Sequence, residues 1–108
     1  MIIAVDFDGT LCANAWPNIG KPNKDLIEYL RGRRKAGDQL ILWTMREGEL
    51  LQKAVKWCEH FSLFFDAVND NTEAQKARYN NNPRKVFADW YIDDHNAEKA
   101  TDFPRGIY

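Results

Sequence analysis

Aspartate residues occur in two close pairs in the sequence, and each pair follows a run of apolar residues. Asp6 and Asp8 form the first pair, and Asp93 and Asp94 form the second. Carboxylates gathered in one place repel one another unless a cation compensates their charge. Their hard oxygen atoms, with room left for water, favour Mg²⁺. The sequence therefore predicts a magnesium site if the fold brings the pairs together. Taken one at a time, each aspartate could instead end a strand or cap a helix.

Three further side chains have a type and position that could complete such a site. Thr44 ends a second apolar run, and Arg46 lies two residues beyond it. Arg46 can pair with the charge of a substrate, or it can start the next helix and face solvent. Lys85 can be a solvated charge before a strand, or an ammonium that bridges a carboxylate and a bound phosphate. Position alone leaves both alternatives open for each of these two cations.

The apolar pattern predicts strands and helices that alternate along the chain. Continuous apolar runs predict strands over residues 2–7, 39–44, 63–68 and 86–92. Apolar residues at helical spacing predict helices over residues 23–36, 47–60 and 72–79. Gly37 is placed to end the first helix. Residues 12–24 contain two prolines, a glycine and three asparagines, and are predicted to form a loop.

This alternation predicts an α/β fold. Right-handed crossovers between the strands would give a three-layer, Rossmann-like, open and mostly parallel sheet with helices on both faces. Ligands of such sheets bind at the carboxyl ends of the strands, which is where Asp6, Thr44 and Asp93 fall. Alternation along an extended strand further predicts that Asp6 and Asp8 point to the same side, with Phe7 turned into the protein.

With these motifs in this order, the chain resembles the haloacid dehalogenase (HAD) superfamily of phosphotransferases. Residues 6–10, Asp-Phe-Asp-Gly-Thr, are similar to its first motif, D-x-D-G-T after a buried strand. Thr44 is similar to the second motif, Lys85 to the third, and Asp93 with Asp94 to the fourth. The resemblance covers nearly the whole chain.

The resemblance implies a Mg²⁺-dependent phosphatase that forms an aspartyl-phosphate. Asp6 would be the nucleophile, and Asp8 would be the general acid for the leaving alcohol and then the base for water. Asp8 favours a phosphatase because haloalkanoate dehalogenases lack an aspartate at that position. Thr44 would hydrogen-bond a phosphoryl oxygen, and Lys85 would stabilise the charge of Asp6 and the phosphate.

The resemblance also implies the ligands of the metal. Asp6, the backbone carbonyl of Asp8 and Asp93 would hold Mg²⁺, with Asp94 either a further ligand or a partner of one. Two other functions stay open. The chain could transfer the phosphoryl group to an alcohol, as mutases do, or it could be a non-catalytic module that binds phosphate or a partner.

The length of the chain predicts one HAD-like core domain over residues 1–108 with no cap domain. The predicted elements fill the intervals between the motifs, and only residues 12–24 remain as a short flap with Trp16 near its tip. An uncovered site suits a phosphorylated macromolecule, or a small phosphoester enclosed by a second copy of the chain in a homo-oligomer.

Composition excludes several classes of protein. A formal net charge of -1 argues against general nucleic-acid binding. The apolar runs are too short to span a membrane, and a secretory signal peptide is not expected. Two cysteines are too few for a disulfide framework, so we expect reduced thiols in a cytoplasmic protein. The physiological substrate is not predicted.

Overall fold

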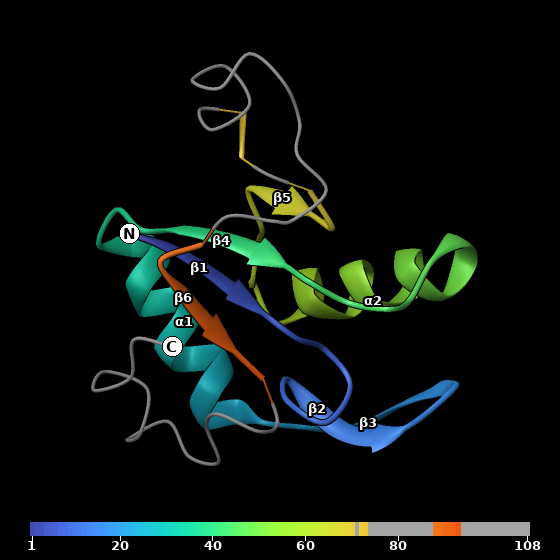
Figure 1. Cartoon of the computed structure of the whole chain (residues 1–108). Coiled ribbons are helices and arrows are strands. Elements are labelled where there is room, and N and C mark those ends of the chain that lie inside the picture. The colour runs from blue at the N-terminus through green and yellow to red at the C-terminus, as the bar shows by residue number, and fades with distance from the viewer. Residues whose placement is uncertain (71, 74–87, 94–108) are drawn as a thin grey trace.

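The computed structural model describes residues 1–70, 72–73 and 88–93, which form an α/β fold (Figure 1). A four-stranded sheet has the order β5-β4-β1-β6, and its strand pairs are all parallel. The strands are β1 (Ile2–Val5), β4 (Gln39–Leu42), β5 (Ala67–Val68) and β6 (Trp90–Ile92). The prediction of a mostly parallel α/β sheet is therefore confirmed.

Strand β1 lies inside the sheet, between β4 and β6, and each of its four residues is buried. A strand covered on both faces needs apolar residues throughout, and Ile-Ile-Ala-Val meets that need. Val5 pairs with Leu42 on one side and with Ile92 on the other. The chain therefore leaves β1, β4 and β6 at the same level of the sheet.

Two helices follow the predicted boundaries closely. Helix α1 spans Lys24–Lys35, and its N-cap Asn23 accepts a hydrogen bond from the backbone nitrogen of Leu26 at 3.3 Å. Gly37, which follows the C-cap, adopts a φ of +106°, a conformation that favours glycine. Helix α2 spans Gly48–His60.

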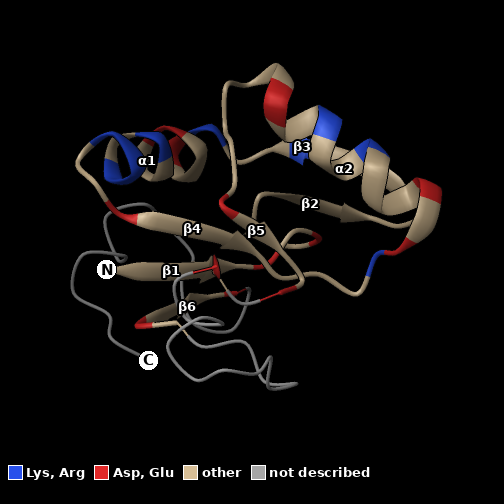
Figure 2. Ribbon diagram, turned by 90° about the horizontal axis from the view of Figure 1, so that it is seen from above, with Lys and Arg blue, Asp and Glu red and all other residues tan. Residues whose placement is uncertain are grey.

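Both helices pack on the same face of the sheet (Figure 2). Alternation along β1 directs Ile3 and Val5 to this face, where they join buried residues of α1 and α2 in the main core. Ile2 and Ala4 point to the opposite face and belong to a second, smaller cluster. The prediction of helices on both faces depends on residues 72–79, which lie outside the described residues beyond position 73.

The prediction of a loop over residues 12–24 is wrong. These residues form an antiparallel hairpin of β2 (Cys12–Ala15) and β3 (Asn18–Pro22), with a register irregularity between Cys12 and Asn14. Most of its side chains are exposed or half-buried, so the sequence carries no alternation of apolar and polar residues. Gly20 allows the two strands to approach, because a Cβ atom there would collide with the carbonyl of Ala13.

All four strands are shorter than predicted, and the last of them, β6, includes neither Ala88 nor Asp89. β1 ends at Val5 because the chain turns at Phe7, whose carbonyl accepts hydrogen bonds from the backbone nitrogens of Thr10 and Leu11. β4 ends at Leu42. The run at residues 63–68 contributes only β5, because Leu63 is directed into the core and pairing with β4 begins at Asp66. In the described part of the chain, neither helix has the length and apolar character needed to cross a lipid bilayer.

Candidate functional site

Three residues predicted for the site meet where the parallel strands end. The backbone nitrogen of Asp6 donates to the carbonyl of Ile92 at 2.9 Å, and that of Trp43 donates to the carbonyl of Val5 at 2.8 Å. Each pairing therefore extends one residue past the regular strands. Asp6, Thr44 and Asp93 consequently line the same pocket, which has a volume of about 560 Å³. This volume is within the range typical of small-molecule sites.

The wall of this pocket combines polar groups with apolar side chains. Among the described residues, its apolar part comes from Ala4, Trp43, Met45, Tyr91 and Ile92. Trp43 is 42% exposed and Met45 is 95% exposed, so the rim presents apolar surface to solvent. Such a rim can contact the uncharged part of a ligand whose charged end reaches the carboxylates.

Thr44 is held in place by two hydrogen bonds. Its backbone nitrogen donates to Oδ1 of Asn69 at 2.7 Å, and its Oγ1 accepts from the backbone nitrogen of Arg46 at 3.1 Å. A hydroxyl that already accepts one bond still has its proton to donate. Thr44 can therefore donate a hydrogen bond toward a ligand in the pocket.

Asn69 is a residue of this site that the sequence analysis missed. It lies directly after β5 and adopts a φ of +52°, a left-handed conformation that asparagine tolerates better than most residues. Its side chain also donates to the carbonyl of Arg46 at 3.5 Å. An asparagine after an apolar run is a recognisable turn signal, but only the fold places it beside Thr44.

Asp8, unlike Asp6, is not among the described residues that line this pocket, and it contacts a different partner. Its carboxylate forms a two-pronged ion pair with Arg46, with distances of 2.9 Å to Nε and 2.8 Å to Nη2. The prediction that strand alternation aligns Asp6 with Asp8 does not apply, because the backbone has already turned at Phe7. Phe7 itself is buried in the core, as predicted.

Arg46 is buried, which contradicts the alternative that it starts a helix and faces solvent. Its side chain is 0% exposed, and helix α2 begins two residues later, at Gly48. A buried guanidinium needs compensation of its charge, and Asp8 supplies it. The hydrogen bonds that Arg46 donates to the Asp8 carboxylate accordingly raise the pKa of Arg46 above its ordinary value.

The donors that could hold a metal are oxygen atoms. No three His, Cys, Asp or Glu side chains gather into a metal-binding group within residues 1–70, 72–73 and 88–93. Asp6 and Asp93 leave neighbouring strands at the same level, and two carboxylates supplemented by backbone carbonyls and water suit Mg²⁺. The predicted residues Lys85 and Asp94 lie outside the described part of the chain.

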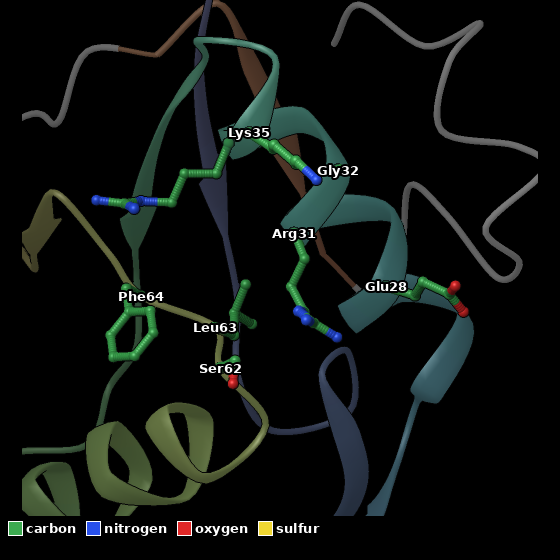
Figure 3. A pocket seen from close by; sticks show the side chains of 8 residues that line it. Glu28, Arg31, Gly32, Lys35, Ser62, Leu63 and Phe64 are labelled. Carbon is green, nitrogen blue, oxygen red and sulfur yellow. The ribbon is translucent and has the colours of Figure 1, made fainter.

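A second pocket, of about 590 Å³, lies between α1 and the loop that precedes β5 (Figure 3). Arg31 points into this space, whereas the carboxylate of Glu28 is turned away from it. Arg34 and Lys35 also line the pocket and belong to the last turn of α1, where cations are stabilised by the helix dipole. This end of α1 leads into the start of β4, so the second pocket is at the opposite end of the sheet from Asp6.

Comparison with solved structures finds a relative of this chain. A conserved protein coded by a locus of Bacteroides thetaiotaomicron is 41% identical, with a TM-score of 0.79 over 89% of this chain and 77% of that protein. The chain belongs to the family of this protein. The family is thus shown by both sequence and fold, and the name of the relative states no function. No protein-family model and no curated protein match the chain.

Proposed function

We propose that this member of the family is a Mg²⁺-dependent phosphomonoester hydrolase of the HAD type, acting through an aspartyl-phosphate. The observation that supports the proposal most is the convergence of Asp6, Thr44 and Asp93 on one pocket at the carboxyl edge of a parallel sheet. That edge is where α/β sheets of this kind bind their ligands. The proposal includes the finer architecture, a three-layer Rossmann-like fold without a cap domain.

In the first half of the proposed reaction, the phosphoryl group moves to Asp6. A carboxylate oxygen of Asp6 forms a bond to phosphorus, and the bond from phosphorus to the alcohol oxygen breaks with its electron pair left on that oxygen. In the reactive state Asp8 carries a proton, which its ion pair with Arg46 disfavours, and gives it to the departing oxygen. Thr44 donates a hydrogen bond to a phosphoryl oxygen, and Lys85 is proposed to stabilise the charge there.

In the second half, water attacks the phosphorus of the aspartyl-phosphate. Asp8, now a carboxylate, takes a proton from the water as the new bond forms. The bond from phosphorus to Asp6 breaks, phosphate leaves and both carboxyl groups return to their starting states. Splitting the hydrolysis in two lets the same acid and base serve both displacements.

Mg²⁺ fits the oxygen donors of this site. Asp6, Asp93 and the backbone carbonyl of Asp8 would hold it, and Asp94 would be a further ligand or a partner of one. When bound, the ion neutralises the negative charge of the phosphoester and of the carboxylates around it. The two free cysteines, both buried, also agree with a reducing compartment, and we propose a cytoplasmic location.

The proposal is tested with p-nitrophenyl phosphate, Mg²⁺ and purified protein. We expect phosphate release that requires Mg²⁺ and falls more than about a thousand-fold in Asp6→Asn, because the nucleophile is lost. The matched control is Asp25→Asn, an exposed aspartate in the first turn of α1, which should keep full activity. Robust turnover by Asp6→Asn or in excess EDTA would sink the proposed mechanism.

The same protein distinguishes the other two functions. A phosphotransferase would transfer phosphate to added alcohols in place of releasing it, so the phosphorylated alcohol and the free phosphate are measured together. A non-catalytic module would bind Mg²⁺ but form no beryllofluoride adduct on Asp6. We expect free phosphate as the main product and a stable adduct.

A further inference from the structure

The side chain of Arg46 forms hydrogen bonds with three residues of the protein, Asp8, Pro17 and Asn18. Besides its two bonds to Asp8, the guanidinium donates from Nη1 to the carbonyl of Pro17 at 3.3 Å and from Nη2 to the carbonyl of Asn18 at 3.0 Å. Pro17 lies in the turn of the hairpin, and Asn18 is the first residue of β3. One side chain therefore joins the hairpin to the segment that follows β1.

Two aromatic rings flank the same guanidinium. Its central carbon lies 5.1 Å from the ring centroid of Phe7 and 5.0 Å from that of Trp16. Such distances are typical of cation–π contacts, which strengthen when water is excluded. Phe7 is part of the core and Trp16 is at the hairpin turn, so the stacked rings link the same two regions as the hydrogen bonds do.

Few donors remain on Arg46 for a substrate. A guanidinium carries five N–H groups, and the bonds to Asp8, Pro17 and Asn18 use four of them. The side chain is also 0% exposed. A substrate phosphate would thus have to displace existing contacts in order to pair with Arg46. These contacts argue for a role inside the protein.

We propose that Arg46 is a positioning residue, which fixes the Asp8 carboxylate and the β2–β3 hairpin relative to each other. The inference rests on the proposed function, because it assigns Asp8 its place as the acid that protonates the leaving alcohol. Arg46 acts through Asp8 and does not itself touch the reacting atoms. Its backbone nitrogen, bonded to Oγ1 of Thr44, connects the same unit to the phosphoryl-binding side of the pocket.

The leaving group of the substrate gives the decisive test. An alkyl phosphate needs a proton as the alcohol departs, whereas p-nitrophenolate departs readily without one. We measure kcat/KM, which covers the steps up to departure of the leaving group, for both substrates with wild-type protein and with Arg46→Gln. If Arg46 positions the acid, kcat/KM should fall about a hundred-fold for the alkyl phosphate and less than about tenfold for the aryl phosphate, as for Asp8→Asn.

Other roles of Arg46 predict different results. An arginine that binds the phosphate would raise KM for both substrates by the same factor in Arg46→Gln, and this outcome would overturn the proposal. Arg33→Gln is the matched control, because Arg33 also pairs with an aspartate, Asp38, at 2.7 Å, but does so at the start of β4. We expect equal kcat/KM ratios for the two substrates in this variant and in wild-type protein.

A second measurement keeps the inference testable without reference to turnover. Arg46→Ala leaves space for the lost group, so added guanidinium should restore much of the activity on the alkyl phosphate, whereas a misfolded variant would not recover.

In protein labelled with 5-fluorotryptophan, the Trp16 fluorine signal should shift in Arg46→Gln and be unchanged in Arg33→Gln. An unchanged Trp16 signal would refute the link to the hairpin. An inactive wild-type protein would refute the proposed function, whereas an active one with unchanged substrate preference in Arg46→Gln would refute only the positioning role.

Discussion

The carboxyl edge of the sheet and the β2–β3 hairpin both border the candidate site, but different forces hold them. The edge follows from β1, whose residues are all buried, and from parallel pairing that runs on to Asp6. The hairpin lies beyond the ends of β1 and β4 (Figures 1 and 2). Most of its side chains are exposed or half-buried. Cys12 of β2 is buried in the main core and Ile19 of β3 packs against it, whereas the turn is joined to the body by the hydrogen bonds of Arg46 to the carbonyls of Pro17 and Asn18.

This difference separates the residues that stabilise the fold from those that position the groups of the candidate site. Apolar burial provides most of the free energy of folding and is not directional. Hydrogen bonds to a buried charge contribute less in total, but they fix the direction of the groups that they join. We therefore expect substitutions in the sheet to lower global stability, and substitutions in the hairpin to act mainly on the site.

The largest effect on stability is expected from Leu42→Ala in β4. Leu42 is fully buried in the main core, and removing such a side chain typically costs about 2–5 kcal/mol because a cavity remains. Urea denaturation followed by circular dichroism measures the change. Met45→Ala is the control, because Met45 is 95% exposed and should alter the free energy of unfolding by less than about 0.5 kcal/mol. Equal effects of the two substitutions would contradict the burial of β4.

Two glycines offer a paired test of the hairpin. Gly20→Ala places a Cβ against the Ala13 carbonyl, which should cost about 1–3 kcal/mol and shift the fluorine signal of labelled Trp16. In contrast, Gly32→Ala meets no atom within 4 Å in the middle of α1 and should stabilise the protein by about 0.5–1 kcal/mol. If Gly20→Ala unfolds the whole chain, the distinction between hairpin and sheet fails.

The smallest effect concerns the two free cysteines, Cys12 in the hairpin and Cys58 in α2, which packs on the sheet. Burial raises the pKa of Cys12, at the start of β2, and raises the pKa of Cys58, in α2, to about 12. Both thiols should therefore react slowly with a thiol reagent at pH 8. We expect Arg46→Gln to accelerate labelling of Cys12 and not of Cys58, because the loosened hairpin exposes Cys12 by more than the loss of the cation raises its pKa. Mass spectrometry of the labelled peptides measures both rates. Equal acceleration at both sites would show that Arg46 supports the whole fold.

The raised pKa of Cys58 also gives the direction of a pH effect. The folded protein holds this thiol proton more tightly than the unfolded chain does, so the stabilising contribution is complete below the ordinary pKa of 9.0 and is lost as the pH rises above it. The urea midpoint should fall between pH 9 and 10, and less so in Cys58→Ala. A midpoint that rises over this range would contradict the burial of the thiol.

The sequence alone predicted the parts of the fold that depend on local pattern. Leu26, Ile27 and Leu30 marked α1, and its end at Gly37 followed from the left-handed conformation that glycine adopts readily. The apolar runs that precede Asp6, Thr44 and Asp93 predicted three buried strands with polar residues at one edge. Burial on both faces leaves a continuous apolar run, which can be recognised without knowledge of the partners.

Only the tertiary structure decided how the rest of the site is built. The hairpin has no apolar periodicity, and its pairing depends on the approach of Gly20 to Ala13. The sequence does not distinguish Arg46 from an arginine that faces solvent. Its burial depends on Asp8 and on main-chain carbonyls that are distant in sequence. Asn69 reaches Thr44 only because β5 lies next to β4. The sequence thus determined which residues lie at the strand ends. Contacts between distant segments decided which of these residues act together, because a buried charge is stable only where the fold brings its partners to it.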